Sequence, residues 1–232
     1  MKKEYILLGS LLCVLLAAGI WIYSIVREYQ KAGNEYESLK EYVTEELKTP
    51  EPNPATGQEN DKNDTRQILE EKEVEVDFQA LQELNPDIVA WLRIPGVMDY
   101  PVVQGKDNAY YLKHTFKKEY NIAGSIFLDY RNQKDFSDSK SIIYGHNMKD
   151  GSMFHVLRKF QKLDFFREHQ KLYLYLPEGE RLVFDITAYE EVPADSEVYQ
   201  LVNENIKMKE IILSTCSSRS DKRLIIRGTE IP

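Results

Sequence analysis

The sequence predicts a mainly β fold: an eight-stranded closed β-barrel with an N-terminal helical extension and short helices in its connections. The prediction rests on eight short strand-like runs between residues 89 and 231 and on the few helical patterns between them. Many short strands with so few helices favour a barrel over a doubly wound sheet. A chain of 232 residues, 42% of them hydrophobic, is long enough for one well-buried domain with appendages.

The chain opens with an apolar stretch, in which the 22 residues between Glu4 and Arg27 carry no charge. As a helix this stretch would span the roughly 30 Å of a bilayer core, and the two lysines before it favour a cytoplasmic N-terminus. We therefore expect residues 1–27 to be a single-pass membrane anchor and the rest of the chain to lie outside the cell. The alternative is a signal peptide cleaved near residues 17–19, although the apolar run is longer than a typical signal core.

Residues 28–75 are expected to form a helical stalk followed by an acidic, flexible linker. Residues 27–48 are rich in helix formers, and residues 49–65 concentrate proline, asparagine, glycine and charge. Residues 28–75 hold 14 acidic and 6 basic residues and so account for the whole formal charge of −8. No basic stripe remains elsewhere, which argues against a nucleic-acid partner.

Residues 76–232 are expected to form the catalytic domain. Asp77 can cap a short helix that Asn85 and Pro86 end. The expected strands follow at residues 89–94, 100–104, 124–130, 140–146, 171–176, 181–192, 210–216 and 222–231, with helical interruptions at 108–114 and 152–160. In the run 171–176 leucines alternate with tyrosines, which is typical of a strand buried on one face.

Cys216 is the first candidate for chemistry. The other cysteine, Cys13, lies in the apolar stretch, so Cys216 has no disulfide partner in the soluble part of the chain. Its strand puts Ile212, Ser214 and Cys216 on one face and ends at the polar run SSRSDK, so we expect the cysteine at a barrel rim. The simpler interpretation is a small buried hydrophobe.

A thiol nucleophile needs a proton acceptor, and histidine is the usual one. His146 closes the strand SIIYGH where Gly145 lets the backbone turn, and its position at a strand end resembles that of Cys216. The other histidines are expected to be surface or packing residues: His114, His155 and His169.

Acyl transfer also needs a group that stabilises the charge on the carbonyl oxygen, and arginine suits this role. If residues 210–216 and 222–231 pair antiparallel, Cys216 faces Arg223, whereas Arg227 faces Ile212 roughly 13 Å further along the strand. Arg223 is therefore the best candidate, Arg219 in the loop is second, and the alternative is that Arg223 is only a solvated strand end.

Other chemistry lacks support in the sequence. It contains no CxxC, HExxH, P-loop or GxGxxG motif, so we expect no metal, cofactor or nucleotide. No local spacing places Asp129 or Asp138 near His146, and no third group that orients the histidine can be identified.

The chain resembles a class B sortase, a membrane-anchored cysteine transpeptidase of Gram-positive bacteria. The resemblance covers roughly residues 76–232 and runs through NPDIVAWLRIPG, YPVVQGKDNAYYL, GSIFLDYRN, YGHNMKDGSMF, LSTC and KRLIIR. It implies the family's barrel with an N-terminal helical extension, and His146, Cys216 and Arg223 as catalytic residues. It also implies contacts with a sorting peptide at Asn108, Leu112, Tyr199, Ser214 and Thr215.

Two departures from the family pattern bear on substrate preference. Ile212 stands where the pattern T-L-x-T-C begins with threonine, and the segment before residues 210–216 is shorter than in many members, which carry a helical insertion there.

By this resemblance the chain cleaves a C-terminal sorting motif of exported proteins and transfers the product to an amine of a lipid-linked peptidoglycan precursor. A pilin polymerase, with a pilin lysine as the acceptor, is an alternative. A papain-like hydrolase would carry its cysteine before a helix and upstream of its histidine, which is not the order here. The non-enzymatic alternative is an anchored barrel that only binds the wall.

Overall fold

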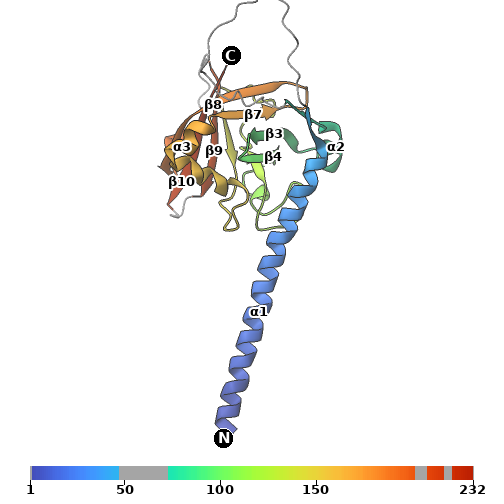
Figure 1. Ribbon diagram of the computed structural model, residues 1–232, viewed down its shortest axis with the longest axis vertical. Coiled ribbons are helices and arrows are strands. Elements are labelled where there is room, and N and C mark those ends of the chain that lie inside the picture. The colour runs from blue at the N-terminus through green and yellow to red at the C-terminus, as the bar shows by residue number, and fades with distance from the viewer. Residues whose placement is uncertain (1, 47–72, 202–207, 217–220, 232) are drawn as a thin grey trace, which may run out of the picture.

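Eight strands close into one barrel in the computed structural model, which describes residues 2–46, 73–201, 208–216 and 221–231 (Figure 1). Around the barrel the strands follow the order β10-β8-β7-β3-β4-β5-β6-β9. The β4–β5 and β6–β9 pairs are parallel and the others antiparallel. The bounds are β3 Ile88–Ile94, β4 Met98–Val103, β5 Ile126–Leu128, β6 Lys140–Tyr144, β7 Lys171–Tyr175, β8 Arg181–Pro193, β9 Glu210–Cys216 and β10 Lys222–Glu230. The predicted barrel and its eight strands are confirmed.

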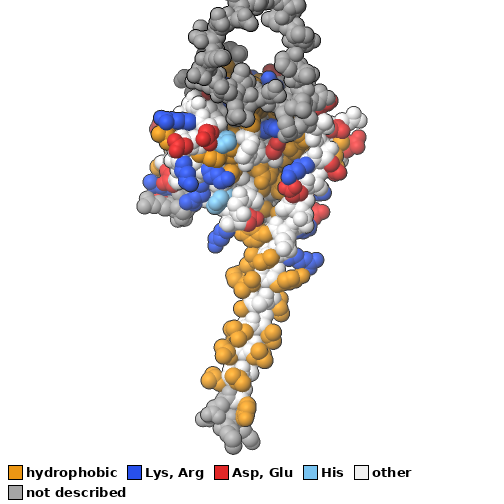
Figure 2. Space-filling view, viewed as in Figure 1, with side chains coloured by type: hydrophobic (Ala, Val, Ile, Leu, Met, Phe, Trp, Pro, Cys, Tyr) orange, Lys and Arg blue, Asp and Glu red, His pale blue; other side chains and the backbone are white. Residues whose placement is uncertain are grey.

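The N-terminal helix α1, Lys2–Glu37, projects far from the barrel (Figure 1). Its first part is covered with exposed hydrophobic side chains (Figure 2). By length and composition this helix could cross a membrane, and an N-terminal signal sequence would meet the same criteria.

The last turns of α1 pack on the barrel. Ala32 and Glu35 are buried there, and the hydroxyl of Tyr36 donates a 2.8 Å hydrogen bond to the carbonyl of Gly124. The 3₁₀ helix η1, Ser38–Tyr42, follows and buries Leu39. The expected helical stalk is therefore continuous with the apolar stretch and docks on the body of the protein.

A small two-stranded sheet, which the sequence did not predict, joins this extension to the barrel. Strand β1, Val43–Glu46, pairs antiparallel with β2, Glu73–Val76. The predicted linker, residues 49–65, lies outside the described residues. Helix α2, Phe78–Leu84, begins at the predicted cap, where the backbone N–H of Ala80 donates to Asp77 Oδ1 at 2.9 Å.

Both faces of the barrel wall are covered. The interior cluster includes the leucines of β7, whereas Tyr173 and Tyr175 belong to a second, outer cluster. The prediction that this strand is buried on one face is wrong, because elements from the N-terminal extension and α2 cover the outer face. The residues that do so include Leu39, Val74, Phe78 and Leu81.

The connections contain short helices. These are η2 (Tyr110–Leu112), η3 (Phe154–Gln161), α3 (Leu163–Glu168) and η4 (Glu197–Tyr199). The helical interruptions predicted at 108–114 and 152–160 are 3₁₀ helices, and α3 and η4 were not predicted. Helices η2 and η4 form two walls of the pocket described next.

Candidate active site

His146 follows the end of β6 and is held by the backbone on both sides. Gly145 N–H donates to the carbonyl of Ser214 at 3.1 Å, and Phe154 N–H donates to the carbonyl of His146 at 2.9 Å. A Cβ on Gly145 would lie 2.5 Å from Ile126 Cδ1, so only glycine fits this close approach. The turn that presents the histidine therefore depends on the glycine before it.

The imidazole of His146 is oriented by a main-chain carbonyl. Its Nε2 lies 2.7 Å from the carbonyl oxygen of Leu112 in η2. Because a carbonyl oxygen only accepts, Nε2 carries the hydrogen in this contact, and in the neutral ring Nδ1 is then the basic nitrogen. The orienting group that sequence reasoning could not identify is thus a backbone atom, which no side-chain pattern announces.

The pairing of β9 with β10 has the predicted register. Cys216 is opposite Arg223, and Arg227 is opposite Ile212. The guanidinium Nη1 of Arg223 donates to the carbonyl of Lys222 at 3.2 Å. Arg219, the second candidate, lies outside the described residues.

The parallel pairing of β6 with β9 brings His146 close to Cys216. Tyr144 is opposite Ser214 in this ladder, so continuing it by two residues sets His146 beside Cys216. The backbone of Cys216 belongs to β9, but its side chain lies outside the described residues. The backbone therefore brings the three candidate catalytic positions to one end of adjacent strands.

A pocket of about 440 Å³ lies at this end. The outer-facing residues Phe127, Tyr144 and Ser214 line it, whereas Leu213 and Ile143 face the barrel interior. The pocket thus extends from the predicted rim over the outside of the wall. Seven of the sequence-predicted site residues line it: Asn108, Leu112, His146, Tyr199, Ser214, Thr215 and Arg223.

Tyr199 and Ser214 close one side of the pocket. Their hydroxyl oxygens are 2.8 Å apart, and the ring of Tyr199 stacks on Tyr144 with centroids 6.2 Å apart. The Oγ1 of Thr215, whose side chain alternates with that of Ser214 along β9, is buried and has no hydrogen-bond partner among the described residues.

The buried carboxylate of Asp129, to which the sequence assigned no role, supports the pocket by bonding to residues of its lining. Asp129, fully buried after β5, accepts bidentate hydrogen bonds from Arg131 at 2.9 and 2.7 Å. It also accepts at 3.0 Å from Asn108 Nδ2 and from the Tyr144 hydroxyl. Arg131 in turn donates to the carbonyl of Tyr199 at 3.1 Å. Asp129 and Arg131 together thus link three residues of the pocket lining.

The charge state of this network follows from its contacts. Burial opposes ionisation of Asp129, but the hydrogen bonds from Arg131, Asn108 and Tyr144 outweigh it and lower the pKa of the carboxyl. Burial, followed by the nearby Asp129 carboxylate, raises the pKa of Tyr144. Asp129 is therefore an anion and Tyr144 a neutral donor.

The remaining histidines and Asp138 lie apart from the pocket lining. The ring of His114 stacks on Tyr110 at 4.0 Å, and that of His169 lies 4.3 Å from Phe165. His155 belongs to η3. Asp138 accepts from Asn132 and from the backbone of Gln133, which is the role of a turn residue.

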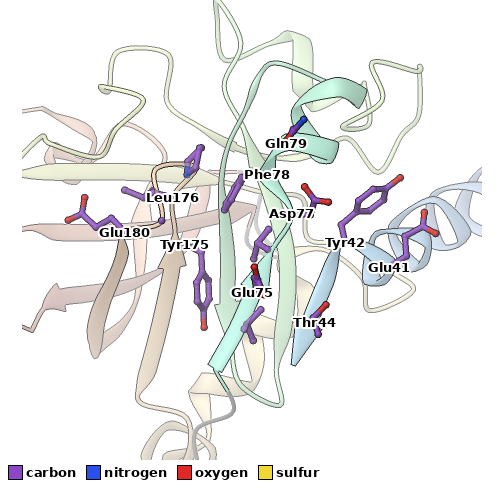
Figure 3. Close-up of a pocket in the computed structure, with 14 residues that line it drawn as sticks. Glu41, Tyr42, Thr44, Glu75, Asp77, Phe78, Gln79, Tyr175, Leu176 and Glu180 are labelled. Carbon is purple, nitrogen blue, oxygen red and sulfur yellow. The ribbon is translucent and has the colours of Figure 1, made fainter. Parts of the chain in front are cut away.

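A second and larger pocket, of about 780 Å³, lies beside β1, β2, α2 and the β7–β8 turn (Figure 3). Figure 3 shows carboxylates and aromatic rings around it, among them Glu41, Asp77, Tyr42 and Tyr175. Its described lining contains no histidine, cysteine or arginine. Nucleophilic chemistry therefore has its candidate residues in the smaller pocket.

Comparison with known proteins gives a consistent family. A family model described as the Sortase domain matches residues 92–231. Sortase B of Staphylococcus aureus is 30% identical over 183 residues, which cover 67% of this chain and 75% of that protein. Sortase B of Listeria monocytogenes is 55% identical over 98 residues, 42% of this chain, but the match spans only 40% of the Listeria protein.

A solved structure extends the likeness to the fold. A Streptococcus pyogenes class B sortase involved in pilus biogenesis superimposes with a TM-score of 0.62 at 32% sequence identity. The match covers 67% of this chain and 98% of that one.

Proposed function

The chain belongs to class B of the sortase family, and we propose that it is a cysteine transpeptidase that cleaves a C-terminal sorting motif through a thioester on Cys216. The observation that carries the proposal is the convergence on one strand end of His146, Arg223 and the backbone of Cys216, beside a pocket fit for a peptide. Nothing in this chemistry calls for a cofactor.

In the first half-reaction the Cys216 thiolate attacks the carbonyl carbon of the scissile peptide bond, which we take to follow a threonine. A carbon–sulfur bond forms and a tetrahedral oxyanion develops, which the Arg223 guanidinium stabilises. The oxyanion collapses, the carbon–nitrogen bond breaks, and imidazolium His146 gives its proton to the departing amine. The products are a thioester on Cys216 and a free C-terminal fragment.

In the second half-reaction an amine attacks the thioester carbonyl. Neutral His146 accepts a proton from the attacking amine, the carbon–sulfur bond breaks, and Cys216 leaves as the thiolate. A new amide bond results, and both residues return to their starting charges. Water in place of the amine would give a free acid, which is the hydrolytic side reaction.

The sorting peptide is proposed to lie along the pocket. Asn108 and Leu112 lie on one wall and Tyr199 and Ser214 on the other, and Thr215 is the fifth proposed contact. The Asn108 amide already donates to Asp129, and its oxygen accepts from Tyr130 N–H. Asn108 therefore has one N–H left for a peptide carbonyl.

The acceptor is proposed to be an amine of a lipid-linked peptidoglycan precursor. Attachment of one pilin subunit to a lysine of another is the second candidate, because the Streptococcus pyogenes relative is described as involved in pilus biogenesis. A ladder of high-mass covalent polymers in cells would favour pilin joining, and a single wall-linked product would favour the precursor.

The proposed location is the outer face of the cell membrane of a Gram-positive bacterium. The apolar part of α1 would be the single-pass anchor, residues 1–27, with its N-terminus in the cytoplasm. Residues 28–75 would be the stalk and linker, and 76–232 the catalytic domain. Both the sorting substrate and a lipid-linked acceptor would then be within reach.

The test is incubation of the detergent-solubilised chain with a library of sorting-type peptides, followed by mass spectrometry of the intact protein. We expect a thioester adduct that maps to Cys216, persists in Cys13→Ala and disappears in Cys216→Ala. Intact peptides with an unmodified thiol would contradict the proposal. A Cys216→Ala strain with unchanged surface-protein attachment would instead favour the anchored barrel that only binds the wall.

A further inference from the structure

The barrel contacts α1 almost where its apolar stretch ends. The last residue of that stretch is Val26. Asn121 Nδ2 donates to the carbonyl of Glu28 at 3.1 Å, and Lys31 pairs with Glu119 at 2.6 Å. With a rise of about 1.5 Å per residue, the first contact lies roughly 3 Å along the helix axis from the apolar stretch. The barrel therefore lies directly beside the end of the apolar stretch, and it would also lie beside any bilayer that surrounds this stretch.

The end of the barrel that α1 contacts is the end that carries the candidate active site. Residues 113–125 lead directly into β5, whose Phe127 is opposite Tyr144 at the end of β6. His146 follows two residues later and touches Leu112, which precedes the same segment. In Figure 1, α1 passes along the β3–β4 side of the barrel and leaves from its lower end.

Exposed apolar side chains are concentrated on the segment between α1 and the pocket. Outside α1 the described residues include eight exposed large hydrophobic side chains, and four of them lie within residues 110–122. We call these four the juxtahelical edge: Tyr110, Leu112, Tyr120 and Ile122, exposed by 39%, 38%, 62% and 38%. His114 joins two of them, with its ring stacked on Tyr110 and its centroid 6.0 Å from Tyr120.

We propose that the juxtahelical edge sits in the headgroup region of the bilayer that α1 spans, so that the barrel rests on the lipid surface with its pocket beside it. The inference rests on the membrane location given under the proposed function. Tyrosine suits this position because its ring is apolar and its hydroxyl stays hydrated. The exposed Lys113 and Lys117 on the same segment would face anionic headgroups.

The test measures how deeply single labelled positions of the protein lie in the lipid bilayer. The vesicles are made of equal parts of phosphatidylcholine and phosphatidylglycerol. The full chain, with Cys13→Ala and Cys216→Ala, receives one cysteine at a time for an environment-sensitive fluorophore. Lys117→Cys reports on the edge, Leu15→Cys on the apolar stretch, and Glu180→Cys on the opposite end of the barrel. Lipids with a nitroxide near the headgroup serve as the quencher.

We expect the label at 117 to be quenched several-fold more than the label at 180, together with strong quenching by acyl-chain nitroxides at 15. If the label at position 15 is quenched but the label at position 117 is quenched no more than the label at position 180, the barrel does not rest on the lipid surface. That result would overturn the seating of the barrel and leave the membrane anchor intact. An unquenched label at 15 would overturn the anchor and the seating together. If the edge served a protein partner, 117 would stay unquenched in these pure lipid vesicles, which also overturns the proposal.

A second measurement separates the seating from catalysis. Tyr120→Glu combined with Ile122→Glu should lower quenching at 117 several-fold and slow turnover of a lipid-tethered sorting peptide, while turnover of the same peptide in solution stays unchanged. The matched control is Leu84→Glu with Leu163→Glu, two exposed apolar residues elsewhere on the surface. Equal turnover of the tethered peptide by the edge variant and the control would contradict the proposal, and so would an equal loss on both forms of the peptide.

Discussion

Arg223 lies directly opposite Cys216 in the antiparallel pair of β10 with β9, while Arg227, on the same strand, is opposite Ile212. The two arginines share a strand and a charge but differ in their distance from the cysteine. Their comparison therefore separates a role in chemistry from a role in folding.

Arg223→Lys is expected to lower kcat on a sorting peptide by about a hundredfold, because lysine keeps the charge but loses the fork of donors. Arg227 bonds to Glu190 and Glu210 on neighbouring strands, so Arg227→Lys serves as the matched control and should keep kcat. Steady-state kinetics on both variants check this. Equal losses would show that Arg223 acts through the strand pairing rather than on the oxyanion.

Asp129→Asn is expected to destabilise the fold by about 1–3 kcal/mol, because it removes the charged acceptor of a buried network. It should also raise KM more than it lowers kcat, since Asn108, Tyr144 and Arg131 line or support the pocket and have no part in the proposed bond-breaking steps. Denaturant unfolding and steady-state kinetics measure the two effects. Asp164→Asn, at an exposed carboxylate of α3, is the control, and a variant that matches it in stability and KM would contradict the supporting role.

The same carboxyl predicts a dependence of stability on pH. Its pKa is lowered in the folded protein, so the stabilisation it provides is complete above the unfolded value of about 3.9 and is lost as the pH falls through the folded pKa. Wild type should therefore lose more unfolding free energy than Asp129→Asn when the pH is lowered from neutral to acid. Parallel curves for the two proteins would contradict the assignment.

Gly145→Ala is expected to displace His146 and to lower both kcat and stability, the latter by about 1–3 kcal/mol. The reason is steric: the new Cβ would lie 2.5 Å from Ile126 Cδ1 and 2.7 Å from Phe154 Cγ. Gly33→Ala, a helical position with nothing within 4 Å of the new Cβ, is the control and should keep activity. A fully active Gly145→Ala would show that the turn relaxes without moving the imidazole.

A fragment that begins at residue 76 is expected to be less stable than one that begins at residue 27. The shorter fragment loses buried Leu39 and Val74, at about 1.5–3 kcal/mol for each fully buried side chain, and uncovers Tyr173 and Tyr175. The longer fragment lacks only the exposed part of α1, and its melting temperature should match that of the full chain in detergent. Thermal melts that coincide for the two fragments would show that the extension adds nothing to the fold.

The strands were predictable because each is a short apolar run bounded by turn residues, and the Cys216–Arg223 register followed from the short loop between two adjacent strands. Contacts between distant segments were not predictable. The pairing of β1 with β2 crosses 26 residues, and the burial of Tyr173 depends on elements more than 90 residues earlier in the chain.

The candidate site likewise contains residues that the sequence predicts and residues that only the fold brings together. His146 and Cys216 carry reactive groups at strand ends, so residue type and position point to them. Asp129 is an ordinary acidic residue in the sequence, and only the fold brings Asn108 and Tyr144 to its carboxylate. The Leu112 carbonyl that orients the imidazole has no sequence signature at all.

The parallel ladder between β6 and β9 also has a consequence for biosynthesis. Its partners Tyr144 and Ser214 are 70 residues apart in the chain, and contacts of such long range carry a high closure entropy and form slowly. A partly folded chain would hold the cysteine and the histidine on separate segments, without a common site. If Cys216 acts as proposed, its thiol would gain its proton partner only when β6 and β9 pair, so an incompletely folded chain would lack the reactive site.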